Sequence, residues 1–218
     1  MDSRSGTLTM KIDFQKSLSE TYWARYKKYG SVPEGVFWVS KNRQGLRFKL
    51  ILDEIYKIDR SSKLKLADVG CGYGALVSYL KSSKKNFNIR YTGYDISQKL
   101  IGICNEQFDE DWVKFRVGTR PSELTDYSVM SGTYNLAATS DIFDWEEYVW
   151  DCLWQCWQYT AKAMIFNLQI SKTATITNSH IYYSEKAHVL EKCLSAFGPT
   201  KLVAHRDLPN DVLFVVLK

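Results

Sequence analysis

The chain has 218 residues and a formal net charge of +5, from 29 basic and 24 acidic side chains. This length fits one domain with an elaboration and a large core. The charge falls well short of an obligate nucleic-acid binder, and no apolar run is long enough to span a bilayer. The N-terminus lacks the apolar core of a signal peptide, and the five cysteines show no Cys-x-x-Cys spacing. We therefore expect a cytoplasmic protein without a membrane partner.

The first predicted elements are two helices. Residues 12–29 carry an aromatic and apolar stripe spaced mostly by four, made of Phe14, Leu18, Tyr22, Tyr26 and Tyr29. Residues 41–58 have Ser40 as a candidate N-cap and an apolar face toward a core. The loop between them contains Pro33, Gly35 and Trp38.

This N-terminal segment has more tyrosine and tryptophan than a packing helix requires. Such side chains offer flat apolar area with a polar handle, which suits the lining of a pocket. We therefore predict that residues 1–60 form a helical cap whose first helix, loop and Trp38 lie over a ligand pocket. A simple hydrophobic staple between the two helices is the alternative interpretation.

The next segment contains the most informative pattern of the chain. A predicted strand at 64–69 passes Asp68 and enters a turn with three glycines at alternate positions, followed by a helix at 74–83. Glycine lets the backbone approach a ligand closely and tolerates positive φ, and the first turn of the helix presents free N–H groups. The following strand, 90–94, leads into Asp95, an acid placed where βαβ nucleotide sites bind ribose hydroxyls.

Strands and helices then alternate to the end of the chain, at 97–108, 113–117, 127–132, 145–159, 162–168, 184–196, 200–206 and 211–217. This order predicts an α/β fold, a Rossmann-like three-layer sandwich with a mostly parallel seven-stranded sheet. The last two strands are joined by too few residues for a crossover helix, so we expect a C-terminal antiparallel hairpin. Residues 61–218 would form this domain, after the cap at 1–60.

The pattern Asp-x-Gly-x-Gly-x-Gly from Asp68, followed by Gly-Tyr-Asp ending at Asp95, resembles class I S-adenosylmethionine-dependent methyltransferases. The resemblance covers roughly 64–136 and extends to small stand-alone bacterial members of unassigned substrate, which share the Ser-Gly-x-x-Asn pattern at 131–135. It implies S-adenosyl-L-methionine as cofactor, with its methionine end on the glycine turn and its ribose on Asp95. A dinucleotide enzyme is the alternative, since Gly70-x-Gly72-x-x-Ala75 also fits that fingerprint. No second domain remains to hold a hydride acceptor.

Ligands of such folds bind beyond the carboxyl ends of the strands. Together with the resemblance, this rule selects the candidate cofactor-binding residues Asp68, Gly70, Cys71, Gly72, Tyr73, Gly74, Asp95, Ile96, Gly118, Thr119, Ser131, Gly132 and Trp38. The resemblance implies that Gly118 and Thr119 contact the adenine and that residues 131–135 flank the methyl group.

The catalytic residues cannot be named from the sequence, and Tyr134, Asn135 and His180 are weak candidates. We expect no metal, because the acids at Asp141 and Asp144 lack the following Asp-Asn pair of metal-dependent relatives.

The acceptor is expected to be a small molecule methylated at O, N or C. An RNA or protein acceptor is the alternative, for which a basic face could be formed by Arg25, Lys27, Lys28, Lys41, Arg43, Arg47 and Lys49. A cofactor-binding module without turnover is a third interpretation.

Overall fold

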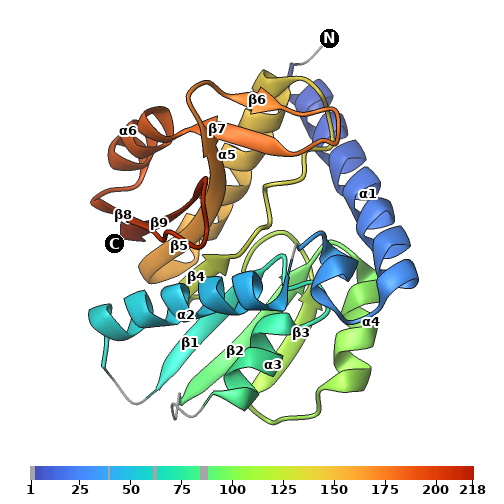
Figure 1. Cartoon of the computed structure of the whole chain (residues 1–218), viewed down its shortest axis with the longest axis vertical. Helices are drawn as coiled ribbons and strands as arrows, with labels where there is room; N and C mark the ends of the chain where they lie inside the picture. The colour runs from blue at the N-terminus through green and yellow to red at the C-terminus, as the bar shows by residue number, and fades with distance from the viewer. Residues whose placement is uncertain (1–2, 39, 61–62, 84–87) are drawn as a thin grey trace.

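The computed structural model describes residues 3–38, 40–60, 63–83 and 88–218. One sheet forms the centre, with helices on both faces (Figure 1). The helices are α1 (Ser3–Tyr29), α2 (Lys41–Ile58), α3 (Ala75–Ser82), α4 (Gln98–Gln107), α5 (Ile142–Gln158) and α6 (Lys186–Ala196), with a short 3-10 helix η1 (Pro33–Val36). The strands are β1 (Leu64–Val69), β2 (Ile89–Asp95), β3 (Val113–Val117), β4 (Thr125–Met130), β5 (Thr160–Ser171), β6 (Thr175–Ile176), β7 (Tyr182–Glu185), β8 (Thr200–Ala204) and β9 (Asp211–Leu217).

The strand order confirms the predicted α/β architecture. The first five strands are parallel in the order β3-β2-β1-β4-β5. Strand β9 then pairs antiparallel with β5, and β8 pairs antiparallel with β9, which is the expected C-terminal hairpin. The carboxyl ends of β1, β2 and β4 therefore meet at one edge of the sheet.

The sheet has nine strands among the described residues rather than the predicted seven. Strand β5 continues to Ser171, beyond its predicted end at 168, and its last residues pair with β7. The partner of β7 is β6, which has only two residues. Such short strands contain too little alternation of polar and apolar residues to be recognised in a sequence.

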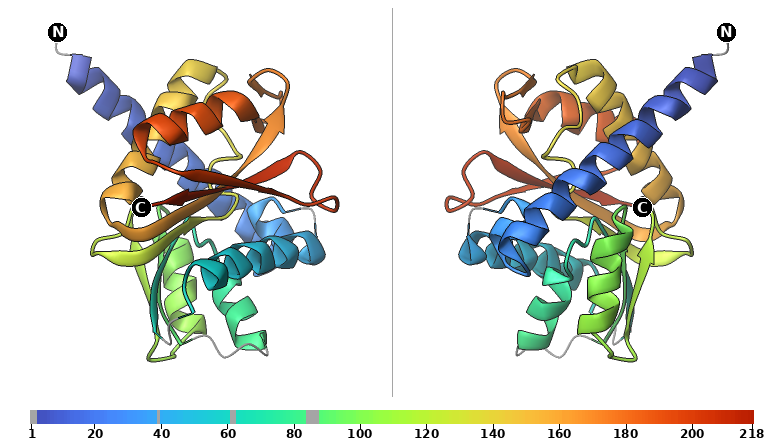
Figure 2. Two further views of the ribbon diagram at one scale, coloured as in Figure 1. Left: turned by 90° about the vertical axis from the view of Figure 1, so that its left-hand side faces the viewer. Right: turned by 90° about the vertical axis from the view of Figure 1, so that its right-hand side faces the viewer.

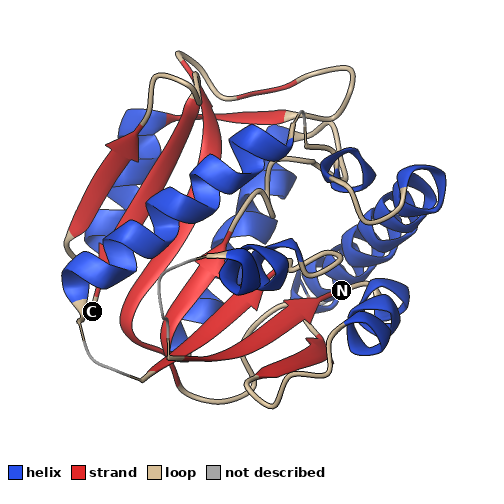
Figure 3. Cartoon of the chain, turned by 60° about the horizontal axis from the view of Figure 1, so that its bottom comes forward, coloured by secondary structure: helices blue, strands red, loops and turns tan. Residues whose placement is uncertain are grey.

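Successive side chains of the strands point to opposite faces, so two cores form. On one face, α2, α3 and α4 pack against Leu66, Tyr91, Tyr127 and Ile165. On the other face, α5 and α6 cover a core that includes Met164 and Phe166, together with residues from α1. Figure 3 shows helices on both sides of the sheet. Helix α2 thus belongs to a layer of the sandwich, while the proposed boundary at residue 60 stays a prediction.

Helix α1 runs diagonally across the molecule, and its N-terminal end extends beyond the body (Figure 2). Near the middle of α1, Phe14 contacts Tyr148 of α5 at 5.8 Å between ring centroids. Further along, the ammonium of Lys99, on α4, lies 5.3 Å from the centroid of the Trp23 ring. The helix therefore bridges α5 and α4, and it begins well before its predicted start at 12. Although α1 has 27 residues, no described helix, α1 included, is long and apolar enough to cross a bilayer.

A substitution of Phe166, in the middle of β5, tests the packing of this core. Phe166 is fully buried and stacks on Phe214 of β9 at 5.2 Å. Phe166→Ala should lower the free energy of unfolding by about 3–5 kcal/mol, because the cavity cannot collapse fully. Urea denaturation measures this. Leu124→Ala, at a side chain that is 60% exposed, is the control and should change stability by less than about 0.5 kcal/mol. Equal effects of the two variants would contradict the packing described.

Candidate functional site

The glycine turn after β1 crosses over the end of β2. The backbone N–H groups of Gly70 and Cys71 both donate to the carbonyl oxygen of Tyr94, at 2.7 and 3.0 Å. Gly70 has a φ of 79°, and a Cβ there would lie 2.6 Å from the side chain of Thr133. A residue with a side chain would therefore be strained at this position and would also collide with the loop after β4.

Asp95 at the end of β2 is tied to this turn. One carboxylate oxygen accepts a hydrogen bond from the N–H of Gly72 at 2.9 Å, and the other accepts one from the N–H of Ser97 at 2.8 Å. Burial raises the pKa of Asp95, and the two backbone donors act against that shift. Each oxygen keeps a free lone-pair direction, so the carboxylate can still accept hydrogen bonds from a ligand.

Asp68 is a second buried carboxyl group at the same edge. It accepts a hydrogen bond from the Tyr91 hydroxyl at 2.7 Å. Burial raises its pKa to about 7, while the Tyr91 hydrogen bond lowers it and the nearby charge of Asp95 raises it further. A cationic group bound nearby would favour the ionised form of both carboxyl groups.

These residues line a first cavity at the carboxyl ends of the strands, with ≈ 900 Å³ of space, open solvent at its mouth included. Every predicted cofactor-binding residue lines it, with the exception of Gly74. A Cβ on Gly74 would lie 2.5 Å from the ring of Phe108, so this glycine permits packing of the helix start instead.

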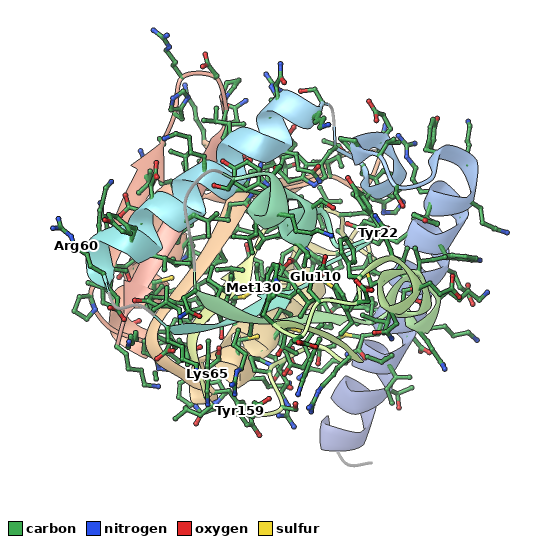
Figure 4. The ribbon with its side chains drawn as sticks, turned by 90° about the horizontal axis from the view of Figure 1, so that it is seen from below. Tyr22, Arg60, Lys65, Glu110, Met130 and Tyr159 are labelled. Carbon is green, nitrogen blue, oxygen red and sulfur yellow. The ribbon has the colours of Figure 1, made fainter. Side chains whose placement is uncertain are left out.

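The N-terminal segment closes one side of the first cavity. Leu18 and Tyr22 of α1, Val36 of η1 and Trp38 all line it. Figure 4 labels Tyr22 on the side of α1 that faces the sheet. Burial, and then the charge of Asp95, raises the pKa of Tyr22. The first helix, the loop and Trp38 thus border this cavity, while their role as a cap over a bound ligand stays a prediction.

Two polar side chains in the first cavity lack partners. The hydroxyl groups of Ser131 and Tyr134 are buried and make no hydrogen bond in the described structure. Such groups are costly unless something satisfies them, and a polar ligand could do so. Burial also raises the pKa of Tyr134 well above its ordinary value. This candidate catalytic residue would therefore act as a hydrogen-bond donor and not as a base.

A second cavity, with ≈ 1070 Å³ of space that again includes open solvent, adjoins the first. The two share Tyr22, Val36, Trp38 and Gly132 as lining residues. Asn135 lines the second cavity, and its side-chain oxygen accepts a hydrogen bond from the N–H of Gln169 at 3.2 Å.

The third catalytic candidate lies elsewhere. His180 is exposed in the turn between β6 and β7 and lines neither cavity. Across the described ranges, no group of three or more histidine, cysteine or acidic side chains could hold a metal ion. The expectation of a metal-free site stays a prediction.

Several lining residues were not predicted from the sequence. Gln44 of α2 accepts a hydrogen bond from the Tyr73 hydroxyl at 3.3 Å, and Thr133 donates to the Val69 carbonyl at 2.7 Å. Thr133 belongs to the segment 131–135 that was expected to flank the methyl group, although it was not among the candidate cofactor-binding residues. The remaining lining residues outside the predicted site are Leu18, Tyr22, Val36, Phe48, Val69, Ala75, Leu76, Tyr148 and Cys152. The lining residues that lie on helices could not be predicted, because in the sequence they look like ordinary core positions.

Of the seven basic residues considered for a basic face, Lys27, Lys28, Lys41 and Arg43 are exposed, while the other three are engaged within the chain. Arg47 is only 4% exposed and pairs with Asp211. Lys49 pairs with Asp53 at 2.6 Å, and the Arg25 guanidinium donates to the carbonyl of Glu34 at 2.8 Å.

Comparison with known proteins gives a consistent result. Residues 67–163 match the family model described as "Methyltransferase domain". Rv1506c of Mycobacterium tuberculosis, itself only provisionally assigned as a methyltransferase, is 25% identical over 150 residues, covering 68% of this chain and 89% of that protein.

Solved structures share the fold. Magnesium protoporphyrin IX methyltransferase (ChlM) from Synechocystis, with bound S-adenosylhomocysteine, has a TM-score of 0.65 at 12% identity and covers 94% of this chain and 97% of its own. An S-adenosylmethionine-dependent methyltransferase from Leishmania major has a TM-score of 0.64 at 11% identity, with 92% and 82% covered. Residues 67–163 thus match a methyltransferase domain, and the chain is similar to methyltransferases in sequence and shares the fold of S-adenosylmethionine-dependent members.

Proposed function

We propose that this enzyme transfers the methyl group of S-adenosylmethionine to a small-molecule acceptor, with the cofactor in the first cavity and the acceptor in the second. The observation that carries the proposal is the shared lining of the two cavities. Gly132 and Trp38 border both, so a group in one cavity can meet a group in the other at this junction.

Each end of the cofactor has matching residues in the first cavity. Asp95 would accept hydrogen bonds from the ribose hydroxyl groups, since its two oxygens each retain acceptor capacity. The backbone from Gly70 to Gly72, with Asp68 behind it, would hold the charged methionine end. Gly118 and Thr119 would border the adenine, and the unpartnered Ser131 and Tyr134 hydroxyls would gain polar partners.

Catalysis would depend mainly on position. The sulfonium of the cofactor supplies an already activated methyl group. The residues of this chain would then align the two reactants, which is worth several kcal/mol of barrier. Tyr22 and Trp38 would keep water out of the junction, and Tyr134 would donate a hydrogen bond.

A small-molecule acceptor is favoured over a macromolecule for two reasons. Three of the seven basic residues that could have formed a nucleic-acid face, Arg25, Arg47 and Lys49, are instead engaged within the chain. In addition, ChlM, which shares this fold, is a magnesium protoporphyrin IX methyltransferase and so acts on a small molecule. The five cysteines are all free and buried, which supports the proposed cytoplasmic location.

Asp95→Asn tests the cofactor site. The variant keeps the shape of the side chain but removes the charged acceptor, and hydrogen bonds to charged groups contribute about 1.5–3 kcal/mol each. Affinity for S-adenosylhomocysteine, measured by calorimetry, should therefore fall about tenfold or more. Asp109→Asn, at an exposed acid, is the matched control and should bind normally. Unchanged affinity in Asp95→Asn would remove this residue from the site.

Methyl transfer itself tests the acceptor class. The enzyme and S-adenosylmethionine with a labelled methyl group are incubated with a cell extract that has been separated by size. We expect the label in the low-mass fraction, and Asp95→Asn should reduce it. Label that appears in RNA or protein, and that likewise requires the enzyme, would contradict the small-molecule proposal. It would not contradict the proposed cofactor site.

A further inference from the structure

The lining of the second cavity carries more positive than negative charge. The charged side chains among its described lining residues are two arginines, Arg43 and Arg47, and one carboxylate, Asp211. Most of the remaining lining is apolar or aromatic, including Phe37, Leu136, Ile181, Leu208 and Pro209. A ligand that matches this cavity combines an apolar body with a negative charge.

Arg47 is held rigidly from two sides. Its Nη2 pairs with a carboxylate oxygen of Asp211, and the same oxygen accepts a hydrogen bond from the Gln169 amide at 3.0 Å. Its guanidinium carbon also lies 4.1 Å from the centroid of the Trp38 ring. A guanidinium fixed in this way loses little conformational freedom when it binds a further group.

The guanidinium of Arg47 still has binding capacity. Its Nε is buried and has no hydrogen-bond partner in the described structure. Burial lowers the pKa of Arg47 to about 9, and the contact with Asp211 acts in the opposite direction, so the group is charged at neutral pH. A buried charged donor without a partner is costly, and an anion would satisfy it.

Arg47 also lies where the two cavities meet. A Cβ placed on Gly132 would be 3.4 Å from Nη1 of Arg47 and 3.4 Å from the Trp38 ring. Because Gly132 lines both cavities, the guanidinium is at the junction between them.

Arg43 lies one turn earlier on α2 and faces the same cavity. Its side chain is exposed and forms no ion pair with any other described residue. The two arginines therefore offer one rigid buried donor group and one adjustable exposed donor group on the same helix.

We propose that the second cavity binds an acceptor that carries a carboxylate on an apolar or aromatic body, with the carboxylate held by Arg43 and Arg47. This inference rests on the proposed function and names the substrate class of the same site. Arginine suits the role because its planar fork matches the two oxygens of a carboxylate.

Matched pairs of acids and amides test the proposal. The probes are phenylacetate, indole-3-acetate and decanoate, each with its amide, titrated by calorimetry into the full chain saturated with S-adenosylhomocysteine. We expect at least one acid to bind at millimolar concentration or below, about tenfold more tightly than its amide. Arg43→Gln should reduce this preference about threefold or more, and Arg43→Lys should restore part of it.

Lys41→Gln is the charge-matched control, because Lys41 is exposed on the same helix and lines neither cavity. It should leave the acid preference unchanged. Equal binding of acids and amides, no binding of any acid, or an equal loss in Arg43→Gln and Lys41→Gln would overturn the proposal. Saturation with S-adenosylhomocysteine is measured first, so a failure of the cofactor site would be recognised separately.

Discussion

The hydrogen bond from the Gly72 N–H to the Asp95 carboxylate is the interaction on which the rest of the site depends. It fixes the turn after β1 against the end of β2, two segments that are adjacent only because their strands pair in parallel. The carboxylate is buried, so its negative charge must be compensated by oriented donors, and the turn provides one of them. The first cavity, where we propose that the cofactor binds, is therefore built around a charge that the backbone already holds in position.

Helix α1 covers part of this open edge. In a Rossmann-like sheet, the carboxyl ends of the strands form a crevice that is exposed to water. Here Leu18 and Tyr22 reach over that crevice from α1, while Phe14 packs on α5 and Trp23 lies beside Lys99 of α4. The chain thus supplies its own cover, and the same cover borders the second cavity through Tyr22 and Trp38.

The parallel sheet and the terminal hairpin could be predicted from the sequence, because they follow from local patterns. Nearly all of the strand-end residues that line the first cavity could be predicted from the rule that ligands bind beyond the carboxyl ends of strands. Sequence-based prediction failed for β6 and β7, which depend on an extension of β5 that only tertiary pairing reveals. It also failed for Arg47, which was read as a surface charge. Its partner Asp211 is distant in sequence, and helical spacing does not show that such a charge is buried and paired. Tyr148 and Cys152 look like core positions and serve partly as such.

The central claim is that the cofactor binds between the strand ends and α1. Hydrogen–deuterium exchange of the full chain, with and without S-adenosylhomocysteine, tests it most directly. The account predicts that the ligand protects both the turn at 70–74 and the N-terminal segment at 18–37, at the same ligand concentration. Protection of the turn without any change at 18–37 would contradict the account, because α1 would then not take part in binding.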